Sequence, residues 1–286
     1  MQNSIIVNNI YFLGPEGSYT EQAKNIFMKE LSVIAEKQYS SNTIKSVLKS
    51  IDNDSSSIAV LPVENSVEGI VRETIDNLIR LKDDSIKIIS ECILPVNHCL
   101  LAKNLDISGI KTIISHPQAI AQCLDFINRD FPNANIIEDV STSAAAKRVS
   151  DSDDLSIAAI ASEYAASLFG LNILQKNIND ENDNQTRFII LGRDFTYSTG
   201  FDKTSIAFST KNEAGALYKV LKIFSDFKIN LLYIDSRPSR KNLGEYTFFI
   251  DFEGHVQDAN IKKALSLLSQ FINFYKLNGS FKRYKK

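Results

Sequence analysis

The stretch NINDENDNQTRFIIL, residues 177–191, is a polar segment that runs directly into a short apolar one. Asn and Asp favour turns because their side chains bond to nearby backbone groups. The apolar residues Phe188–Leu191 are of the kinds that are enriched in buried strands. Thr186 and Arg187 therefore stand where a loop enters a strand, a position that suits ligand-facing side chains. Taken alone, the stretch is also compatible with an ordinary junction that carries a surface arginine.

The length and charge of the chain limit the classes of protein to which it can belong. It has 286 residues, of which 44% are apolar and 23% charged, with a net charge of −2 and a pI of about 6.0. A chain of this length is long for a single hydrophobic core, which predicts two or three folding units. Its near-neutral charge creates no field that attracts nucleic acid or an anionic membrane, so we expect neither as a partner.

The sequence predicts a cytoplasmic protein. It lacks an apolar run of transmembrane length, and its first residues, MQNSIIVNNIYFLGPEG, lack the basic region and long apolar core of a signal peptide. The cysteines Cys92, Cys99 and Cys123 are odd in number and have no CxxC spacing, which is typical of reduced thiols.

Strands and helices alternate over the first two hundred residues, which predicts an α/β fold with mostly parallel sheets. A strand at Ile10–Leu13 leads through GPEGSYT, residues 14–20, into a helix over Glu21–Leu31. Such a turn and helix start form a natural anion site, with Ser18 or Thr20 as the helix cap. The alternative is a plain turn whose glycines serve the backbone alone.

A second lobe is predicted after residue 92. The segment Ile86–Ala102 is too long for one strand, and Pro95 in its middle removes a hydrogen bond from any ladder, so we expect the chain to cross between lobes there. Further α/β elements follow, and the stretch quoted above returns the chain to the first lobe. Two crossings imply a cleft. The expected elements of the second lobe are strands at 112–114, 136–140 and 157–161 and helices at 119–131, 141–149 and 163–169.

Polar turns at the carboxyl ends of these strands are the candidate site, because α/β folds bind ligands at that edge. Glu64, Asn65 and Ser66 follow the strand Ser57–Pro62, although Asn65 or Ser66 can also be the cap of the helix expected over residues 70–81. His116 stands at the start of a helix for which we expect Ser115 as the cap; a lone histidine is also commonly structural.

The pattern changes after a polar linker at residues 197–203. Strands at 205–210, 229–236, 246–252 and 274–278 alternate with helices at 217–227 and 258–271. This βαββαβ order predicts a ferredoxin-like domain. The basic end, Lys282–Lys286, is expected to be a solvated tail.

Taken in order, these motifs resemble those of the prephenate dehydratase family. The resemblance covers nearly the whole chain, and its motifs are GPEGSYTEQA (14–23), PVENSVEGIV (62–71), SHPQAIAQC (115–123), STSAAAK (141–147) and NQTRF (184–188), with shorter matches at 159–162 and 169–171. Ser18 stands where threonine is commoner, and Phe169 where tyrosine is usual. GAL at 215–217 and DSRP at 235–238 resemble the two signatures of a phenylalanine-binding ACT domain, with Asp235 where glutamate is usual.

The resemblance implies a catalytic region, residues 1–196, of two α/β lobes similar to those of periplasmic binding proteins. Lobe 1 is expected at about 1–92 and 179–196, and lobe 2 at about 93–178. A linker at 197–203 then leads to an ACT regulatory domain at 204–286. Members are homodimers or homotetramers that bind L-phenylalanine as an allosteric effector between ACT domains. The chain starts at the catalytic motif, so we expect a monofunctional enzyme without the chorismate mutase domain of some relatives.

The implied enzyme is a hydro-lyase of L-phenylalanine biosynthesis that converts prephenate to phenylpyruvate with loss of CO2 and the hydroxyl. Aromatisation drives the reaction, and no metal-ligand spacing is present, so neither a metal nor another cofactor is expected. By resemblance Thr186 acts in the chemistry, and we expect a hydrogen-bond donor to the leaving oxygen. Glu64 and His116 are the alternatives if a full proton donor is needed. The planar fork of Arg187 predicts a clamp for the pyruvyl carboxylate.

The remaining candidates are implied by their places in the motifs. Substrate-binding residues are expected to be Asn65, Ser66, Ser115, Gln118, Ser141, Thr142, Asn184 and Phe188. Effector-binding residues are expected to be Gly215, Ala216, Leu217, Asn230, Leu231, Asp235, Ser236 and Arg237.

Two other functions fit parts of the sequence. A two-lobed sensor with an ACT domain and no chemistry is one, although the TRF motif at 186–188 argues against it. An arogenate dehydratase is the other, since its substrate differs from prephenate only in carrying an amine in place of the ketone. A carboxylate near the side-chain site would favour arogenate.

Overall fold

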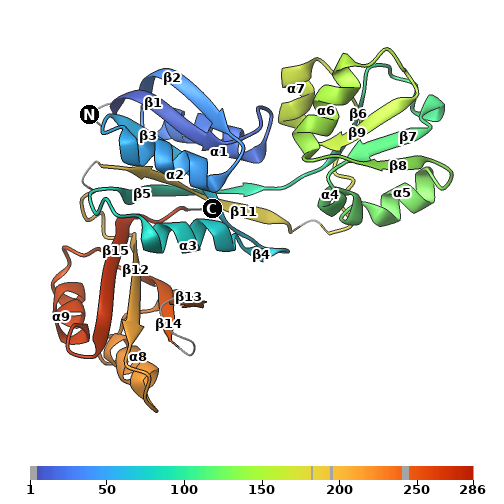
Figure 1. Cartoon of the computed structure of the whole chain (residues 1–286). Helices are drawn as coiled ribbons and strands as arrows, with labels where there is room; N and C mark the ends of the chain where they lie inside the picture. Colours follow the sequence, from blue (N-terminus) through green and yellow to red (C-terminus); the bar gives the residue numbers. More distant parts are fainter. Residues whose placement is uncertain (1–4, 182, 194–195, 240–244, 286) are drawn as a thin grey trace.

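The computed structural model describes residues 5–181, 183–193, 196–239 and 245–285. Two α/β lobes lie side by side, and a third, smaller domain packs against the first of them (Figure 1). A ten-stranded sheet runs through the first lobe and the carboxyl-terminal domain, while the second lobe has a five-stranded sheet of its own. The predicted two-lobed α/β class with a separate carboxyl-terminal domain is confirmed.

Lobe 1 contains a mixed sheet rather than the mostly parallel one expected. β1 pairs in parallel with β2 and β3, but β11 runs antiparallel between β3 and β5 because it brings the chain back from lobe 2. Helix α1 covers one face and α2 and α3 cover the other. The elements are β1 (Ile6–Leu13), α1 (Tyr19–Glu30), β2 (Ile34–Ser41), α2 (Ile44–Asn53), β3 (Ser57–Asn65), β4 (Gly69–Ile70), α3 (Arg72–Arg80), β5 (Lys87–Pro95) and β11 (Gln185–Gly192).

Lobe 2 has the strand order β10-β6-β9-β7-β8, with helices α4 to α7 packed around it. The single helix expected over 119–131 is two helices, with a break at Gln122 and Cys123. Helix α7 ends as predicted at Gly170, whose φ of 66° is a left-handed conformation that favours glycine. The elements are β6 (Cys99–Ala102), η1 (Ile107–Gly109), β7 (Thr112–Ser115), α4 (Pro117–Ala121), α5 (Leu124–Asp130), β8 (Asn135–Glu138), α6 (Thr142–Asp151), β9 (Ile157–Ala161), α7 (Glu163–Phe169) and β10 (Asn172–Gln175).

The chain crosses between the lobes twice. β5 ends at Pro95 in the large sheet, and β6 begins at Cys99 in the small one, so the crossing predicted at Pro95 is confirmed. The return passes through the polar stretch that precedes β11, and both connections are visible between the lobes in Figure 1. The two crossings place β3 and β11, with their polar ends, at the edge of lobe 1 that faces lobe 2.

The carboxyl-terminal domain has the predicted βαββαβ order. Its strands lie in the order β13-β14-β12-β15, with α8 and α9 on one face. β12 already begins at Asp202, inside the expected linker. The elements are β12 (Asp202–Thr210), α8 (Ala216–Asp226), β13 (Leu231–Pro238), β14 (Tyr246–Glu253), α9 (Ala259–Leu268) and β15 (Ile272–Lys282).

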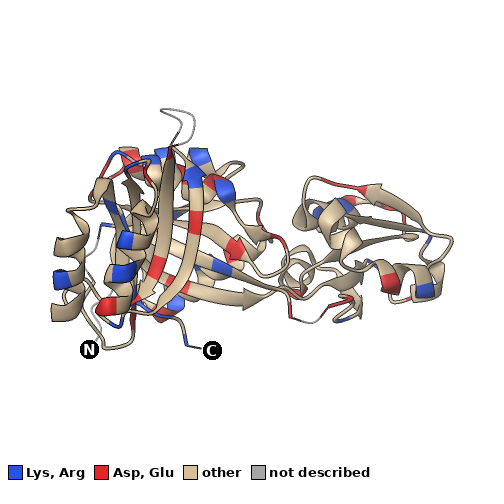
Figure 2. Ribbon diagram, turned by 90° about the horizontal axis from the view of Figure 1, so that it is seen from below, with Lys and Arg blue, Asp and Glu red and all other residues tan. Residues whose placement is uncertain are grey.

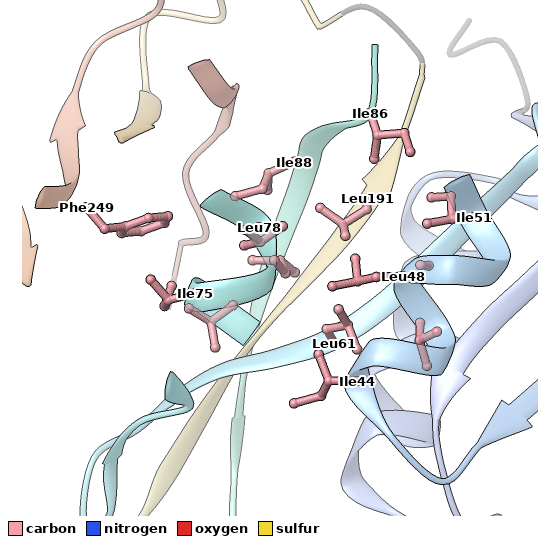
Figure 3. Close-up of a cluster of buried hydrophobic side chains, with 14 of the residues drawn as sticks. Ile44, Leu48, Ile51, Leu61, Ile75, Leu78, Ile86, Ile88, Leu191 and Phe249 are labelled. Atoms are coloured by element: carbon pink, nitrogen blue, oxygen red, sulfur yellow. The ribbon is translucent and has the colours of Figure 1, made fainter. Parts of the chain in front are cut away.

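This domain is joined to lobe 1 by a sheet contact and by a shared core. β15 pairs in parallel with β5 where Gly279 lies opposite Ile88. A Cβ on Gly279 would lie 2.8 Å from the Cβ of Ile88, so only glycine permits this approach. Phe249 of β14 points into the cluster formed by residues such as Ile75 and Leu78 of α3 (Figure 3). The domain is therefore packed on lobe 1 and is not merely tethered to it.

The basic end of the chain is not the solvated tail expected. The backbone N–H of Tyr284 donates to Glu91 of β5 at 3.2 Å. The charged groups of Arg283 and Lys285 lie over the ring of Phe201, at 5.4 and 4.9 Å from its centroid. Aromatic and carboxylate partners thus hold this segment against the body; Lys286 lies outside the described residues.

Charged residues of both signs are interspersed over the ribbon seen in Figure 2. Within the described ranges, no helix is long and apolar enough to cross a membrane.

Candidate active site in the cleft between the lobes

A cavity of about 280 Å³ lies in the cleft between the two lobes. Its lining combines residues from both lobes and from both crossing segments. Of the lining residues that the structure describes, none is Asp, Glu, Lys or Arg. The lining residues are Tyr19, Asn65, Val96, His98, His116, Gln118, Ala119, Gln122, Val140, Ser141, Thr142, Asn184 and Thr186.

Asn65 at the end of β3 orients the hydroxyl of Thr186 on β11. The Asn65 side-chain oxygen accepts from the backbone N–H groups of Val67 and Glu68, each at 2.9 Å. Those two donors fix the amide, so its NH2 group points to Thr186 and donates to Oγ1 at 2.9 Å. The Thr186 oxygen is therefore an acceptor within the protein, and its hydrogen is available to a ligand. Asn65 is part of a turn and is not the cap of α3, which begins after Val71 without a side-chain cap.

A chain of amides continues from this pair across the cleft. Asn65 donates to the Asn184 oxygen at 2.7 Å, and Asn184 donates to the Gln122 oxygen at 3.0 Å. Nε2 of His98 lies 3.1 Å from the same Gln122 oxygen. Burial lowers the pKa of His98, so its ring is neutral and donates from Nε2. Its Nδ1 is a buried acceptor that has no partner among the residues described.

The starts of two lobe 2 helices face the cavity. His116 caps α4, since its Nδ1 accepts from the backbone N–H of Gln118 at 3.3 Å, and a neutral ring then carries its proton on Nε2. The cap predicted there was Ser115, which is wrong: Ser115 is fully buried and donates to the Ile160 carbonyl at 2.6 Å. At α6, Ser141 is the cap and accepts from Ala144 N–H at 3.0 Å. The free N–H groups of the first turn of α6 favour a negative ligand.

The lobes touch at the rim of this cavity. Gly17, with a φ of 81°, lies so close to α6 that a Cβ there would be 2.5 Å from Ser143 Oγ. Ser143 donates its hydroxyl proton to the carbonyl of Glu16, and the Tyr19 hydroxyl donates to the Asn97 carbonyl at 2.7 Å. Gly17 of the first motif is therefore needed for the contact between the lobes as well as for the turn.

The start of α1 does not provide the anion site that the motif suggested. The N–H of Gly17 donates to the Glu21 carboxylate at 2.7 Å, and Ser18, the actual cap, accepts from Glu21 N–H at 3.3 Å. This arrangement is a variant of the capping box, in which the carboxylate accepts from the residue before the cap and not from the cap itself. The carboxylate of Glu21 already occupies the position that an anion would take.

The structure brings together only part of the predicted substrate site. Seven predicted residues line the cavity: Thr186, His116, Asn65, Gln118, Ser141, Thr142 and Asn184. Five others do not: Arg187, Glu64, Ser66, Ser115 and Phe188. Phe188 belongs to the core beneath α1. Ser66 donates to the Asp183 carbonyl at 3.0 Å and accepts from Gln185 N–H at 2.9 Å, which fastens the return loop.

Arg187 and Glu64 lie on the opposite face of the sheet from Thr186. They line a second cavity, of about 710 Å³, beside the carboxyl-terminal domain. Nη1 of Arg187 is 2.6 Å from Asp251 and 3.4 Å from Glu91, and Nε is 3.4 Å from Glu64. Burial acts to lower the pKa of Arg187, but these carboxylates outweigh it and raise that pKa. The physical reason is the strand period of two, which sends Arg187 away from the face that Thr186 occupies.

Three polar lining residues, Tyr19, His98 and Gln122, were not among the predicted site residues. Gln122 lies in the motif at 115–123 and Tyr19 in the motif at 14–23, so motif membership was the signal available for both. His98 follows the crossing at Pro95, and only the fold shows that this crossing borders the cleft.

The predicted effector residues surround one edge of the carboxyl-terminal domain. Gly215 precedes α8 with a φ of 80°, and Asp235 forms an ion pair of 2.7 Å with Arg237 on β13. The carbonyl of Asn230 accepts from Glu253 N–H at 3.0 Å. Neither of the two cavities described above is lined by the predicted set, whose other members are Ala216, Leu217, Leu231 and Ser236.

Comparison with known proteins identifies the family. The family model for prephenate dehydratase matches residues 10–196, and that for the ACT domain matches residues 204–266. The chain belongs to the prephenate dehydratase family. The prephenate dehydratase of Methanocaldococcus jannaschii is 40% identical over 275 residues, which cover 95% of this chain and 97% of that protein.

Solved structures with the same fold include a prephenate dehydratase and a protein named for another activity. The prephenate dehydratase of Arthrobacter aurescens in complex with L-Phe has a TM-score of 0.85 and 32% identity, and the match covers 96% of this chain and 90% of that one. A quorum-quenching acylase, GqqA, has a TM-score of 0.83 and 26% identity, with coverage of 97% and 98%. The family predicted from the motifs, prephenate dehydratase with a carboxyl-terminal ACT domain, is confirmed.

Proposed function

We propose that this chain converts prephenate to phenylpyruvate, CO2 and water in the cleft cavity, with Thr186 as the hydrogen-bond donor to the departing hydroxyl. The observation that carries the proposal is the orientation of Thr186. Asn65 donates to Oγ1 at 2.9 Å, so the Thr186 hydrogen is directed to a ligand rather than to the protein. A donor that is already oriented stabilises the charge that develops on the leaving oxygen.

The absence of charged side chains from the described lining of the cavity supports this chemistry. Prephenate has two carboxylates, and one of them leaves as neutral CO2. An ion pair to that carboxylate would stabilise the substrate more than the transition state, in which the charge moves away, and would slow the reaction. Amide and hydroxyl donors orient the substrate without this penalty.

The hydroxyl leaves more easily when a group in the cavity donates a hydrogen bond or a proton to it, and two residues can do so. Thr186 supplies a hydrogen bond and need not ionise. His116 is the alternative for a full transfer, but only as an imidazolium whose Nδ1 no longer accepts from Gln118 N–H; with Nδ1 capping α4, its Nε2 proton serves as a hydrogen bond. Glu64, the other predicted alternative, lies with Arg187 on the far face of the sheet and is no longer a candidate.

The pyruvyl carboxylate is assigned to the start of α6 in place of the Arg187 clamp. Ser141 and Thr142 line the cavity there, and α6 spans Thr142–Asp151. Its first-turn N–H groups and its dipole favour an anion. Gln118, at the start of α4, contributes a neutral amide from the same lobe.

The cavity favours prephenate over arogenate. Arogenate carries an ammonium group in place of the ketone, and a carboxylate in the site would recognise it. No Asp or Glu is present among the described residues that line the cavity. The amides of Asn184 and Gln122 and the neutral His98 suit a ketone.

We also propose feedback inhibition by L-phenylalanine and assembly into a homodimer or homotetramer in the cytoplasm. The predicted effector residues lie along β13 and at the start of α8, near the edge of the large sheet. An edge strand has backbone groups that can pair with a second copy. The effector would then lie between two ACT domains.

The test is an assay of the purified full chain with prephenate, in which phenylpyruvate is followed by its alkaline ultraviolet absorbance with and without L-phenylalanine. We expect turnover of prephenate and its suppression by L-phenylalanine. Turnover of arogenate alone would reassign the substrate, and no turnover of either would leave a binding protein.

A further inference from the structure

Four buried charges join the ACT domain to lobe 1 directly behind Thr186. Each side contributes one acid and one base: Glu91 and Arg187 come from lobe 1, and Lys203 and Asp251 from the ACT domain. Arg187 lies 2.6 Å from Asp251, and Lys203 lies 2.8 Å from Glu91. All four residues are at most 8% exposed. We call this group the four-charge cluster.

The cluster is connected to the cavity by two neighbouring strands. On β11, Thr186 faces the cavity and Arg187, the next residue, faces the cluster. On β3, Asn65 faces the cavity and Glu64 lies against Arg187. Thr186 is the register partner of Asn65, and Arg187 is that of Glu64. The pair Asn65–Thr186 therefore faces the cavity, and the adjacent pair Glu64–Arg187 lies on the side of the four-charge cluster.

A β-bulge lies at this point of the sheet. The register between β11 and β3 shifts between Arg187 and Phe188. Bulges interrupt the ladder and re-aim the side chains beside them. The ladder beside Arg187 is therefore interrupted on the β3 side, while the pairing of Thr186 and Arg187 with β5 is regular.

The cluster also reaches the predicted effector residues. Asp251 on β14 is the register partner of Tyr233 on β13, and Asp235 on the same strand is the partner of Phe249. A movement of β13 at Asp235 consequently reaches Asp251 across a single strand pair. Because the pairs of the cluster are buried, a movement that separates Asp251 from Arg187 leaves an uncompensated charge, and Arg187 must follow or lose its partner.

We propose that Arg187 is a positioning residue for Thr186, and that its pair with Asp251 carries the state of the ACT domain to the cleft. This inference rests on the proposed function. In it Arg187 does not touch the substrate; it sets the backbone of β11 so that the Thr186 hydroxyl meets the leaving oxygen. Effector binding that shifts β13 and β14 changes this setting.

The experiment is a double-mutant cycle of Arg187→Gln and Asp251→Asn in the full chain, with Arg187→Lys as the conservative variant. We expect each single substitution to lower kcat by about 10- to 100-fold, with KM changed by no more than about twofold. The double variant should lose no more than the worse single one, because both remove the same pair. Inhibition by L-phenylalanine should be lost in Arg187→Gln, in Asp251→Asn and in the double variant. Arg187→Lys should retain more of kcat than Arg187→Gln does.

Arg193→Gln is the matched control. Arg193 directly follows β11 and is itself bonded to Asp83 at 2.8 Å and to two backbone carbonyls, but it contacts no residue of the four-charge cluster in the interactions described. We expect it to keep kcat and the response to L-phenylalanine. Thermal unfolding of each variant shows that comparisons are made between folded proteins.

The outcomes separate this inference from the proposed function. No turnover by the wild-type chain refutes the proposed function itself. A wild-type chain that is active, with variants that raise KM at unchanged kcat, would overturn the inference and return Arg187 to the carboxylate clamp. Variants that keep kcat, and whose activity L-phenylalanine lowers by the same factor as in the wild-type chain, would also overturn it. If the wild-type chain is active but insensitive to L-phenylalanine, additive losses of kcat in the cycle would overturn the positioning role.

Discussion

Thr186 and Arg187 are neighbours on β11, yet their side chains face two cavities that differ in charge. On the Thr186 face, a cavity of about 280 Å³ is lined by amides, hydroxyls, two histidines and a few apolar groups. On the Arg187 face, a cavity of about 710 Å³ is lined largely by charged side chains of both signs. In the proposed function, neutral donors surround a substrate that must lose a charge, whereas the ion pairs on the other face join two domains.

The contrast is a consequence of the strand period. Consecutive residues of a strand point to opposite faces, so the dipeptide Thr186-Arg187 places one residue in the cleft and the other at the ACT domain. In the proposed function, one short motif therefore serves two tasks. Four substitutions test this division of tasks, beyond the cycle on the four-charge cluster.

The largest effect is expected on the neutral face, from Thr186→Ala. Loss of an oriented donor to the leaving oxygen should lower kcat by about 10²- to 10³-fold while KM changes little. Thr186→Ser is the control, because it keeps the hydroxyl, and it should retain most of kcat. Steady-state kinetics with prephenate measure both. A rise in KM at unchanged kcat would remove Thr186 from the chemistry.

Gly17→Ala tests whether the neutral cavity needs the two lobes in contact. The new Cβ would lie 2.5 Å from Ser143 Oγ and 3.0 Å from the ring of Phe169, so these lobe 2 side chains or the lobes themselves must shift. We expect kcat/KM to fall about tenfold because the substrate is held less closely. Gly200→Ala introduces the same backbone strain, with a φ of 79° and no atom within 4 Å, and should keep activity. Equal activity of the two variants would show that closure at Gly17 is not required.

Gly279→Ala tests the charged face by opening the neighbouring sheet contact. Its Cβ would lie 2.8 Å from both the backbone N and the Cβ of Ile88, so β15 and β5 must separate. We expect the free energy of unfolding, measured with denaturant, to fall by about 1–3 kcal/mol. Gly109→Ala, whose Cβ meets only the exposed side chain of Asp106, with Oδ2 at 3.3 Å, should change it by less than about 0.5 kcal/mol. An unchanged stability of Gly279→Ala would contradict a close junction.

The smallest effect concerns the neutrality of His98. Burial lowers its pKa in the folded protein, so below about pH 6.5 the unfolded chain binds a proton that the folded chain resists. This residue therefore makes the protein less stable as the pH falls through that range and has no such effect above it. His98→Gln should flatten the dependence of the free energy of unfolding between pH 8 and pH 5.5. An unchanged slope would mean that His98 does not contribute to it.

Much of the fold and part of the site could be predicted from local pattern. The crossing at Pro95, the end of α7 at Gly170 and the βαββαβ order each follow from residue types with a local conformational effect. Thr186, Asn65, His116, Gln118, Ser141, Thr142 and Asn184 were predicted as site residues and line the cavity. The cap at His116 in place of Ser115 shows the limit of such patterns, since Ser115 bonds to Ile160, forty-five residues away.

The sequence by itself determined the order of the elements, the family and the polar segments that reach the cleft, because each depends on short stretches of chain. Only the tertiary structure decided which face each strand residue takes and which distant residues meet it. Arg187 was expected to bind the substrate for its chemistry alone. Its partners, Asp251 and Glu91, lie 64 and 96 residues away along the chain, and packing of the ACT domain on lobe 1 brings them within ion-pair distance. Side-chain chemistry determines what a residue can bind, whereas the phase of the strand and the packing of domains determine what it meets.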